Sequence, residues 1–246
     1  MQTRGLSGST LKLIAIVTML IDHIGAAVVM RFLMSGKAGI ESYMMYYNLY
    51  NTLRTIGRIA FPIFCFLLIE GFEYTKDRKK YALRLLLFAA ISEIPFDLAF
   101  SSSMLEFDYQ NVFFTLFIGL ITIIAFHAVE EKVEWNPWLR IAVMMAIGFA
   151  GIMLAYFLRT DYDAKGVLCI LALYLFRRQR GLQILAGCLA FGWFELPALV
   201  AFIPIAFYNG KRGWNIKYFF YLFYPLHLLL LYLICQCMGI AGIPAV

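Results

Sequence analysis

The sequence predicts an all-α protein, a polytopic bundle of about eight or nine transmembrane helices with its N-terminus in the cytoplasm. Of its 246 residues, 63% are hydrophobic and only 15% are charged, and the mean hydropathy is +0.78. Soluble domains carry about 25% charged residues, so this composition is typical of an integral membrane protein. The length allows one compact bundle, and we expect residues 1–246 to form a single transmembrane domain.

Nine apolar segments account for the predicted helices. Their ranges are 11–33, 43–72, 81–100, 110–129, 138–158, 164–176, 182–193, 195–208 and 217–237. A full crossing needs roughly 20 residues, so the three segments between 164 and 208 are too short for a full crossing of ordinary length. We expect these three to be tilted, re-entrant or packed at a thinned bilayer, and whether they cross fully is left open.

Basic residues in the loops predict the orientation. With a cytoplasmic N-terminus and nine crossings, fifteen lysines and arginines fall inside, among them Arg4 and the basic stretch 76–84, and four fall outside. The outer four are Arg31, Lys37, Arg159 and Lys165. Positive residues accumulate on the cytoplasmic side of membrane proteins, so we expect the N-terminus inside and the C-terminus outside.

Two arginines, Arg54 and Arg58, lie in the middle of segment 43–72. A charge at that depth costs at least roughly 2.5–3.5 kcal/mol unless it faces a bundle interior or a watery cavity. Residues four apart share one face of a helix, so we expect both guanidiniums to point the same way. This pattern favours an internal anion site. The alternative is ion pairs with buried carboxylates such as Glu93, which would hold helices together.

Asp22 and His23 lie near the midplane of the first segment, at a depth that matches the two arginines. Antiparallel neighbouring helices would bring the imidazole beside the guanidiniums, and nearby positive charge favours the neutral imidazole that a general base requires. Asp22 cannot simply orient His23, because adjacent residues on a helix diverge by about 100°. The alternative for His23 is an interhelical hydrogen bond without a catalytic role.

Segment 81–100 and the start of the next one carry a polar patch. Glu93 and Asp97 are four residues apart around Pro95 and share one side of the helix near the outer leaflet. They are either counter-ions for the arginines or a polar mouth that receives an acceptor. Asn111 extends this patch.

The last segment adds a second intramembrane histidine. Tyr224, Pro225 and His227 lie close together in its sequence. Pro225 would free a backbone carbonyl, and His227 would either bond that carbonyl or face the polar cavity. A structural and a functional role are both open for His227.

Several familiar signatures are missing. The sequence has no Walker loop and no GxGxxG, HExxH or GxSxG motif. Its five cysteines form no CxxC pair and no zinc spacing, so we expect no metal. The net charge of +6 comes from short loops and does not indicate nucleic acid binding. Histidine, carboxylates and arginines within a membrane suit transfer of an activated group from an anionic carrier.

Several blocks of the sequence resemble the TraX family. In chain order they are LKLIAIVTMLIDHIG, RTIGRIAFPIFCFLLIEGF, ISEIPFDLAF, QNVFFTLFIGL, DYDAKGVL and KYFFYLFYPLHLLLLYLI, from about Leu11 to Ile234. TraX of conjugative plasmids is described as N-acetylating F-type pilin, and the family looks similar to acyltransferase-three proteins and heparan-α-glucosaminide N-acetyltransferase. The resemblance implies a multi-pass acetyltransferase of the bacterial cytoplasmic membrane, with acetyl-CoA as donor and an envelope amine or hydroxyl as acceptor.

The resemblance also implies roles for particular residues. In acyltransferase-three proteins, a basic residue, ten positions and a histidine form a motif of the first helix, and Lys12 and His23 have this spacing. His23, with Asp22 beside it, would be the catalytic base. Lys12, Arg54 and Arg58 would bind coenzyme A.

Three function classes remain open from the sequence. An acetyltransferase would bind acetyl-CoA from the cytoplasm, where basic loop residues attract its phosphates. These residues are Arg177, Arg178, Arg180, Lys211 and Arg212. A proton-coupled or anion transporter is the alternative, because buried histidine, carboxylates and arginine also form proton relays. The third is a structural or assembly subunit. Lipids and an envelope acceptor are the other expected partners, and nucleic acid is not.

Overall fold

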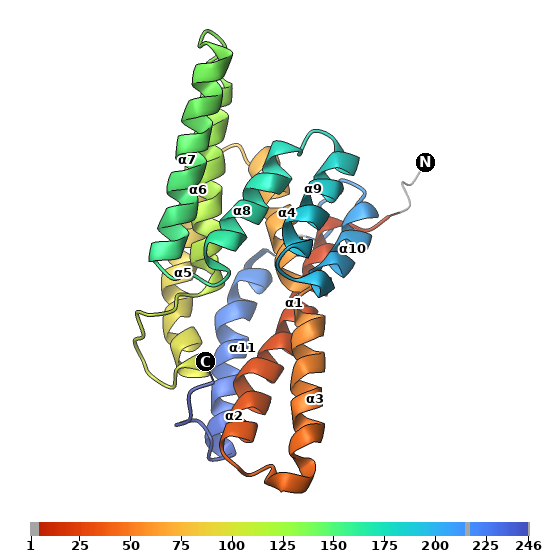
Figure 1. The fold of residues 1–246 in the computed structure, drawn as a ribbon, viewed down its shortest axis with the longest axis vertical. Helices are drawn as coiled ribbons and strands as arrows, with labels where there is room; N and C mark the ends of the chain where they lie inside the picture. The colour runs from red at the N-terminus through yellow and green to blue at the C-terminus, as the bar shows by residue number, and fades with distance from the viewer. Residues whose placement is uncertain (1–4, 215–216, 246) are drawn as a thin grey trace. The chain divides into compact units, whose positions relative to one another are not determined.

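A computed structural model describes residues 5–214 and 217–245, and Figure 1 shows its helices. The prediction for Arg4 lies outside the described residues. The helices in chain order are α1 (Gly8–His23), the π-helix η1 (Ile24–Val29), α2 (Met30–Met34), α3 (Gly39–Gly57), α4 (Ala60–Tyr74), α5 (Arg78–Phe100), α6 (Val112–Glu130), α7 (Pro137–Phe157), α8 (Asp163–Leu175), α9 (Arg180–Gly192), the 3-10 helix η2 (Leu196–Ala201), α10 (Phe202–Ala206) and α11 (Lys217–Cys237). Among the described residues, strand pairing is confined to two isolated β-bridges, Leu6–Tyr208 and Gln110–Thr160. The all-α prediction is confirmed.

The described chain contains five helical runs that are long and apolar enough to cross a membrane. They are Gly8–Met34, Gly39–Tyr74, Val112–Glu130, Pro137–Phe157 and Phe219–Cys237. These runs make the chain a multi-pass membrane protein. The predicted short segments do form helices, but Arg180–Gly192 and Leu196–Ala206 have fewer than 18 residues. The number of crossings and the orientation stay predictions.

The chain divides into two compact units. The first unit consists of Met1–Phe64, Ile91–Glu106 and Glu195–Val246, and the second consists of Cys65–Ala90 and Phe107–Phe194. In the first unit, α1, η1 and α2 follow one another as a helical run, α3 packs along this run, and α11 packs against α1 and η1 (Figure 1).

In the second unit, α6 packs against α7 and α8, and α9 packs against α8. Small residues allow these close approaches. A Cβ added at Gly151 would lie 2.3 Å from the hydroxyl of Thr122, and one at Gly119 would lie 2.4 Å from Cδ1 of Ile170. Small residues at helix crossings are a common means of packing helices in membranes.

The expectation of one continuous helix through segment 43–72 is wrong. α3 ends at Gly57 and α4 begins at Ala60, with Arg58 as the C-cap of α3. Pro62 explains the break, because it has no N–H to donate to the carbonyl of Arg58 four residues earlier. In the first turn of α4 that missing donor does no harm. Arg54 is therefore inside a helix, whereas Arg58 is at its end.

Arg31, predicted as an outer loop residue, is instead fully buried in α2. Its Nε donates to the carbonyl of Ile243 at 2.6 Å, and its Nη2 donates to the hydroxyl of Ser102 at 2.8 Å. These bonds fix the segment after α11 within the first unit. A buried guanidinium with such partners has a structural role, in addition to being one of the basic residues counted on the outer side.

Candidate functional site

Two helices of the first unit bring His23 and His227 together. His23 is the last residue of α1, and His227 lies in α11. Nδ1 of His23 is 2.7 Å from Nε2 of His227, within hydrogen-bond distance. His227 is 5% exposed, and His23 is half-buried. The interhelical hydrogen bond that the sequence offered as an alternative for His23 is therefore present, and it joins the two predicted histidines.

The hydrogen-bond acceptors assign the tautomers of both rings. Nδ1 of His227 is 2.7 Å from the carbonyl oxygen of Phe223, and a carbonyl only accepts, so this nitrogen carries the hydrogen. Nε2 of a neutral His227 is then an acceptor, and Nδ1 of His23 donates to it. Nε2 of His23 is left with a lone pair, which is what a general base requires.

The carbonyl bound by His227 is not the one that Pro225 frees. A proline removes the hydrogen bond to the residue four positions earlier, which is Tyr221 here. His227 bonds the carbonyl of Phe223 in its own helix. Of the two alternatives for His227, a bond to the carbonyl that Pro225 frees is therefore not the one observed.

Aromatic side chains surround the histidine pair. Phe100 meets His23 edge to face, with 5.4 Å between ring centroids. Tyr224, which is buried, makes edge contacts with both histidines, at 6.0 Å to His23 and 5.6 Å to His227. Phe223 lies nearly parallel to His227, with centroids 4.8 Å apart. These rings hold the imidazoles and give the site apolar walls. Tyr224 thus contacts both histidines, and its role in a polar cavity stays a prediction.

Asp22 and Arg54 form an ion pair between α1 and α3. Adjacent residues on α1 therefore serve different partners, as the helical period predicts. The close approach of the two helices depends on Gly57, because a Cβ added there would lie 2.1 Å from Cβ of Asp22. The ion pair thus rests on the absence of a side chain at one position. Asp22 therefore neutralises Arg54.

Arg58 pairs with Glu195, whose Oε1 is 3.0 Å from its Nη1. Arg54 and Arg58 are thus bound to carboxylates on different elements. Neither Asp22 nor Glu195 was predicted from the sequence as a counter-ion. The sequence does indicate Glu195 as a candidate counter-ion, because it is an acidic residue at the start of an apolar segment.

The predicted polar patch of α5 has a different geometry. Asp97 is almost fully buried, and its Oδ2 accepts a hydrogen bond of 2.9 Å from the backbone N–H of Glu106. Glu93 is half-buried one turn earlier. Asp97 therefore fixes the loop after α5, and the role of Glu93 and Asp97 as a mouth for an acceptor stays a prediction.

Lys12 lies far from His23 along α1, and Asn111 belongs to the second unit. Lys12 is eleven residues before His23 on α1, roughly 16 Å along the helix, and its Nζ is 5.4 Å from the ring centroid of Phe220. Asn111 belongs to the second unit, where its side chain caps α6 and donates to the carbonyl of Ala89 at 2.8 Å. Both side chains have local structural partners, so their predicted site roles rest on the sequence.

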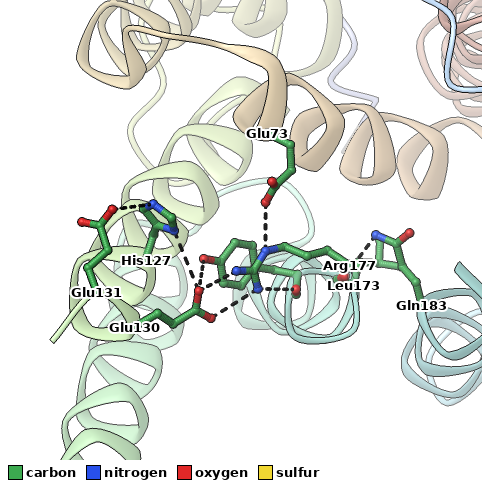
Figure 2. Close-up of polar contacts among 8 residues, drawn as sticks. Glu73, His127, Glu130, Glu131, Leu173, Arg177 and Gln183 are labelled. Carbon is green, nitrogen blue, oxygen red and sulfur yellow. Dashed lines mark hydrogen bonds and ion pairs between the residues drawn. The ribbon is translucent and has the colours of Figure 1, made fainter. Parts of the chain in front are cut away.

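The second unit contains a separate charged cluster, drawn in Figure 2. Nε of Arg177 donates to Glu73 at 2.9 Å, its Nη1 donates to Glu130 at 3.2 Å, and its Nη2 also donates to Glu130. The guanidinium lies 3.8 Å from the ring centroid of Tyr174. Burial alone lowers the pKa of Arg177, but the hydrogen bonds and charges of these partners outweigh it and raise the pKa.

The same cluster contains the third histidine, and a second arginine of this unit has a carboxylate partner of its own. His127 pairs with Glu131 at 3.1 Å on its own helix. Arg180 pairs with Glu70 at 3.2 Å. Two carboxylates take up the donors of Arg177, which leaves few of them available to a phosphate. The expected attraction of phosphates by Arg177 and Arg180 stays a prediction. Within the described residues, no three histidine, cysteine or acidic side chains gather as a metal site would require.

The matches to known proteins extend over almost the whole chain. A family model described as TraX protein matches residues 7–235, a range that includes His23, Arg54, Arg58 and His227. The "Probable fimbrial assembly protein FimC, serogroup H1" of Dichelobacter nodosus is 32% identical over 255 residues, which cover 92% of this chain and 94% of that protein. No solved structure matches.

Proposed function

The chain belongs to the TraX family, and from this premise we propose that it is a membrane-bound acetyltransferase of the bacterial cytoplasmic membrane. It moves an acetyl group from cytoplasmic acetyl-CoA to an amine or hydroxyl acceptor in the cell envelope. The observation that supports this most directly is the hydrogen-bonded pair of His23 and His227 beside the ion pair of Asp22 and Arg54. The relative's name, a probable fimbrial assembly protein, supports a pilin terminus as one acceptor.

In the proposed reaction, both substrates are bound at once and the acetyl group is transferred directly. Nε2 of His23 removes the proton from the acceptor nitrogen or oxygen as that atom attacks the thioester carbonyl carbon. The carbon–sulfur bond then breaks and coenzyme A leaves as the thiolate. His23 returns the proton to the sulfur, so the products are the acetylated acceptor and coenzyme A, and the base is regenerated.

The arginines are proposed to bind acetyl-CoA, together with Lys12. A guanidinium has five N–H donors, and in Arg54 the ion pair with Asp22 is made through Nη1. Nε of Arg54 is buried and has no acceptor among the described residues. A buried donor without an acceptor is costly, so a substrate oxygen placed there would gain binding energy. The candidates are a phosphate oxygen of acetyl-CoA and the oxyanion that forms during transfer.

The apolar walls support a role in group transfer. Phe100, Phe223 and Tyr224 place aromatic rings against the histidine pair, and a site that keeps water out would protect a thioester from hydrolysis. The same buried charges would also suit a proton-coupled transporter, which is the alternative function. The two functions differ in whether acetyl-CoA binds and is consumed.

Mass spectrometry of envelope components tests the proposal. A strain with the gene should carry a component heavier by one acetyl group than the same component from a deletion strain, and a His23→Ala gene should not restore it. Identical acetylation in all strains, with solute uptake by proteoliposomes that lack acetyl-CoA, would instead identify a transporter.

A further inference from the structure

We propose that His227 is a positioning residue that selects the tautomer of His23, so that Nε2 of His23 is the nitrogen that acts as base. The effect on turnover rests on the proposed acetyl transfer. The effect on the tautomer rests on the contacts of the two rings alone, and the two can be measured separately.

The direction of the hydrogen bonds supports this assignment. The chain of donors begins at His23, whose Nδ1 donates to Nε2 of His227 at 2.7 Å. It ends at the carbonyl of Phe223, which accepts from Nδ1 of His227 at 2.7 Å. Because a carbonyl cannot donate, the chain has one direction when both rings are neutral. The tautomer of a histidine is set by the hydrogen bond that its other nitrogen makes.

The relative orientation of the rings strengthens the bond. Their planes are within 5° of parallel and their centroids are 5.0 Å apart, while the bonded nitrogens are 2.7 Å apart. These values place both nitrogens between the two centroids, nearly in line. The rings therefore meet edge to edge with the hydrogen bond in their planes, along the lone pair of the acceptor. Face-to-face packing of the two rings would not give this alignment.

The backbone on the His23 side is unusual at the point where the pair forms. The π-helix Ile24–Val29 begins directly after His23, and π-helical turns are rare and often lie at functional sites. Gly25 in this turn packs tightly against α3, since an added Cβ would lie 3.0 Å from Cβ of Leu53. The wide turn and the close packing fix the end of α1, and with it the direction of the His23 side chain.

A neutral partner has a chemical consequence. In a serine-protease triad, a carboxylate both orients the histidine and stabilises its positive charge. His227 supplies an acceptor without a negative charge, and the nearby carboxylate of Asp22 is bound to Arg54. We therefore assign to His227 the role of orienting His23. Another neutral hydrogen-bond acceptor of similar length should be able to substitute for His227.

Histidine-selective nitrogen NMR of the full protein in nanodiscs tests the tautomer. The chain has three histidines, so single substitutions at His127 and His227 assign all signals. In the wild-type protein at neutral pH, His23 should be protonated on Nδ1 and unprotonated on Nε2. His227→Gln places an amide oxygen near the position of Nε2, so this tautomer should persist and acetyl transfer should stay within several-fold of wild type.

Two variants remove the acceptor. His227→Asn keeps a donor for Phe223 but is too short to reach His23, and His227→Leu removes both polar groups. In both, His23 should become a mixture of tautomers, and transfer should fall by about 10²-fold, the cost of a misplaced catalytic group. Acetyl-CoA binding should not change. His127→Gln is the control and should alter neither measurement.

The outcomes separate the two proposals. An unchanged His23 tautomer in the folded His227→Asn protein would overturn the positioning role. A shifted tautomer in a protein whose wild type transfers no acetyl group would support the positioning role and contradict the proposed function. The Asn and Gln variants retain polarity at a buried position, so the test does not depend on the folding of His227→Leu.

Discussion

Arg54 in the first unit and Arg177 in the second are both guanidiniums held by carboxylates, but they differ in how fully their donors are used. Nε, Nη1 and Nη2 of Arg177 all have acceptors, and its side chain is 8% exposed. Arg54 donates through Nη1 to Asp22, and its Nε is buried without an acceptor among the described residues. A saturated guanidinium stabilises a fold, whereas an incompletely bonded one beside a reactive side chain can receive a ligand.

The histidines show the same contrast. His127 pairs with carboxylates three and four residues away on its own helix, an arrangement that local sequence suffices to produce. His23 bonds to a residue 204 positions away, and only the tertiary fold can bring the two together. A residue type therefore does not identify a site, but its partners and their spacing do.

Removing Arg177 should have the largest effect on stability. Arg177→Ala leaves Glu73 and Glu130 without their shared cation. We expect a loss of about 2–3 kcal/mol, less than the 3–5 kcal/mol for fully buried pairs because both carboxylates are partly exposed. Thermal unfolding in detergent measures it. Acetyl transfer by the folded fraction should match wild type, and a loss of transfer without a loss of stability would erase the contrast between the two arginines.

Adding one methyl group at Gly57 should affect stability and activity together. The new Cβ would overlap the side chain of Asp22, so we expect Gly57→Ala to cost about 1–3 kcal/mol and to break the ion pair with Arg54. Transfer should fall as well. Gly181 is the matched control, because a Cβ there has no neighbour within 4 Å. Equal effects of the two alanines would show that the Asp22–Arg54 contact does not matter.

A conservative change at Arg54 should have the smallest effect. Arg54→Lys keeps a positive charge for Asp22 but loses the fork of donors, including Nε. We expect acetyl-CoA affinity to fall about tenfold, equivalent to about 1.4 kcal/mol, with little change in stability. Calorimetric titration measures the affinity. Arg177→Lys is the control, and an equal loss of affinity there would contradict the assignment of donor binding to Arg54.

Much of the site could be predicted from the cost of burying polar groups in a membrane. That cost points to Arg54, His23 and His227 without knowledge of the fold, and the family resemblance is confirmed. Pro62 accounts for the break after Gly57 once the fold is known, but a proline alone does not predict a break, because Pro95 and Pro225 lie inside continuous helices. Segment lengths could not give the number of crossings, because helices shorter than a span have several solutions in a bilayer.

The pairings themselves could not be predicted. Asp22 pairs with Arg54 only because Gly57 allows α1 and α3 to approach, and such proximity depends on packing rather than on periodicity. Glu195 reaches Arg58 from a turn between two short helices, where no periodic pattern fixes its direction.

Transfer of labelled acetyl groups by the purified protein tests most directly whether His23 is the general base. The comparison is between the His23→Ala and His127→Ala variants. We expect His23→Ala to stay folded and to bind acetyl-CoA but to lose turnover by about 10²-fold or more, since it removes a general base. His127→Ala should transfer acetyl groups at nearly the wild-type rate. Near-normal turnover by a folded His23→Ala protein would show that the histidine pair has no part in the mechanism.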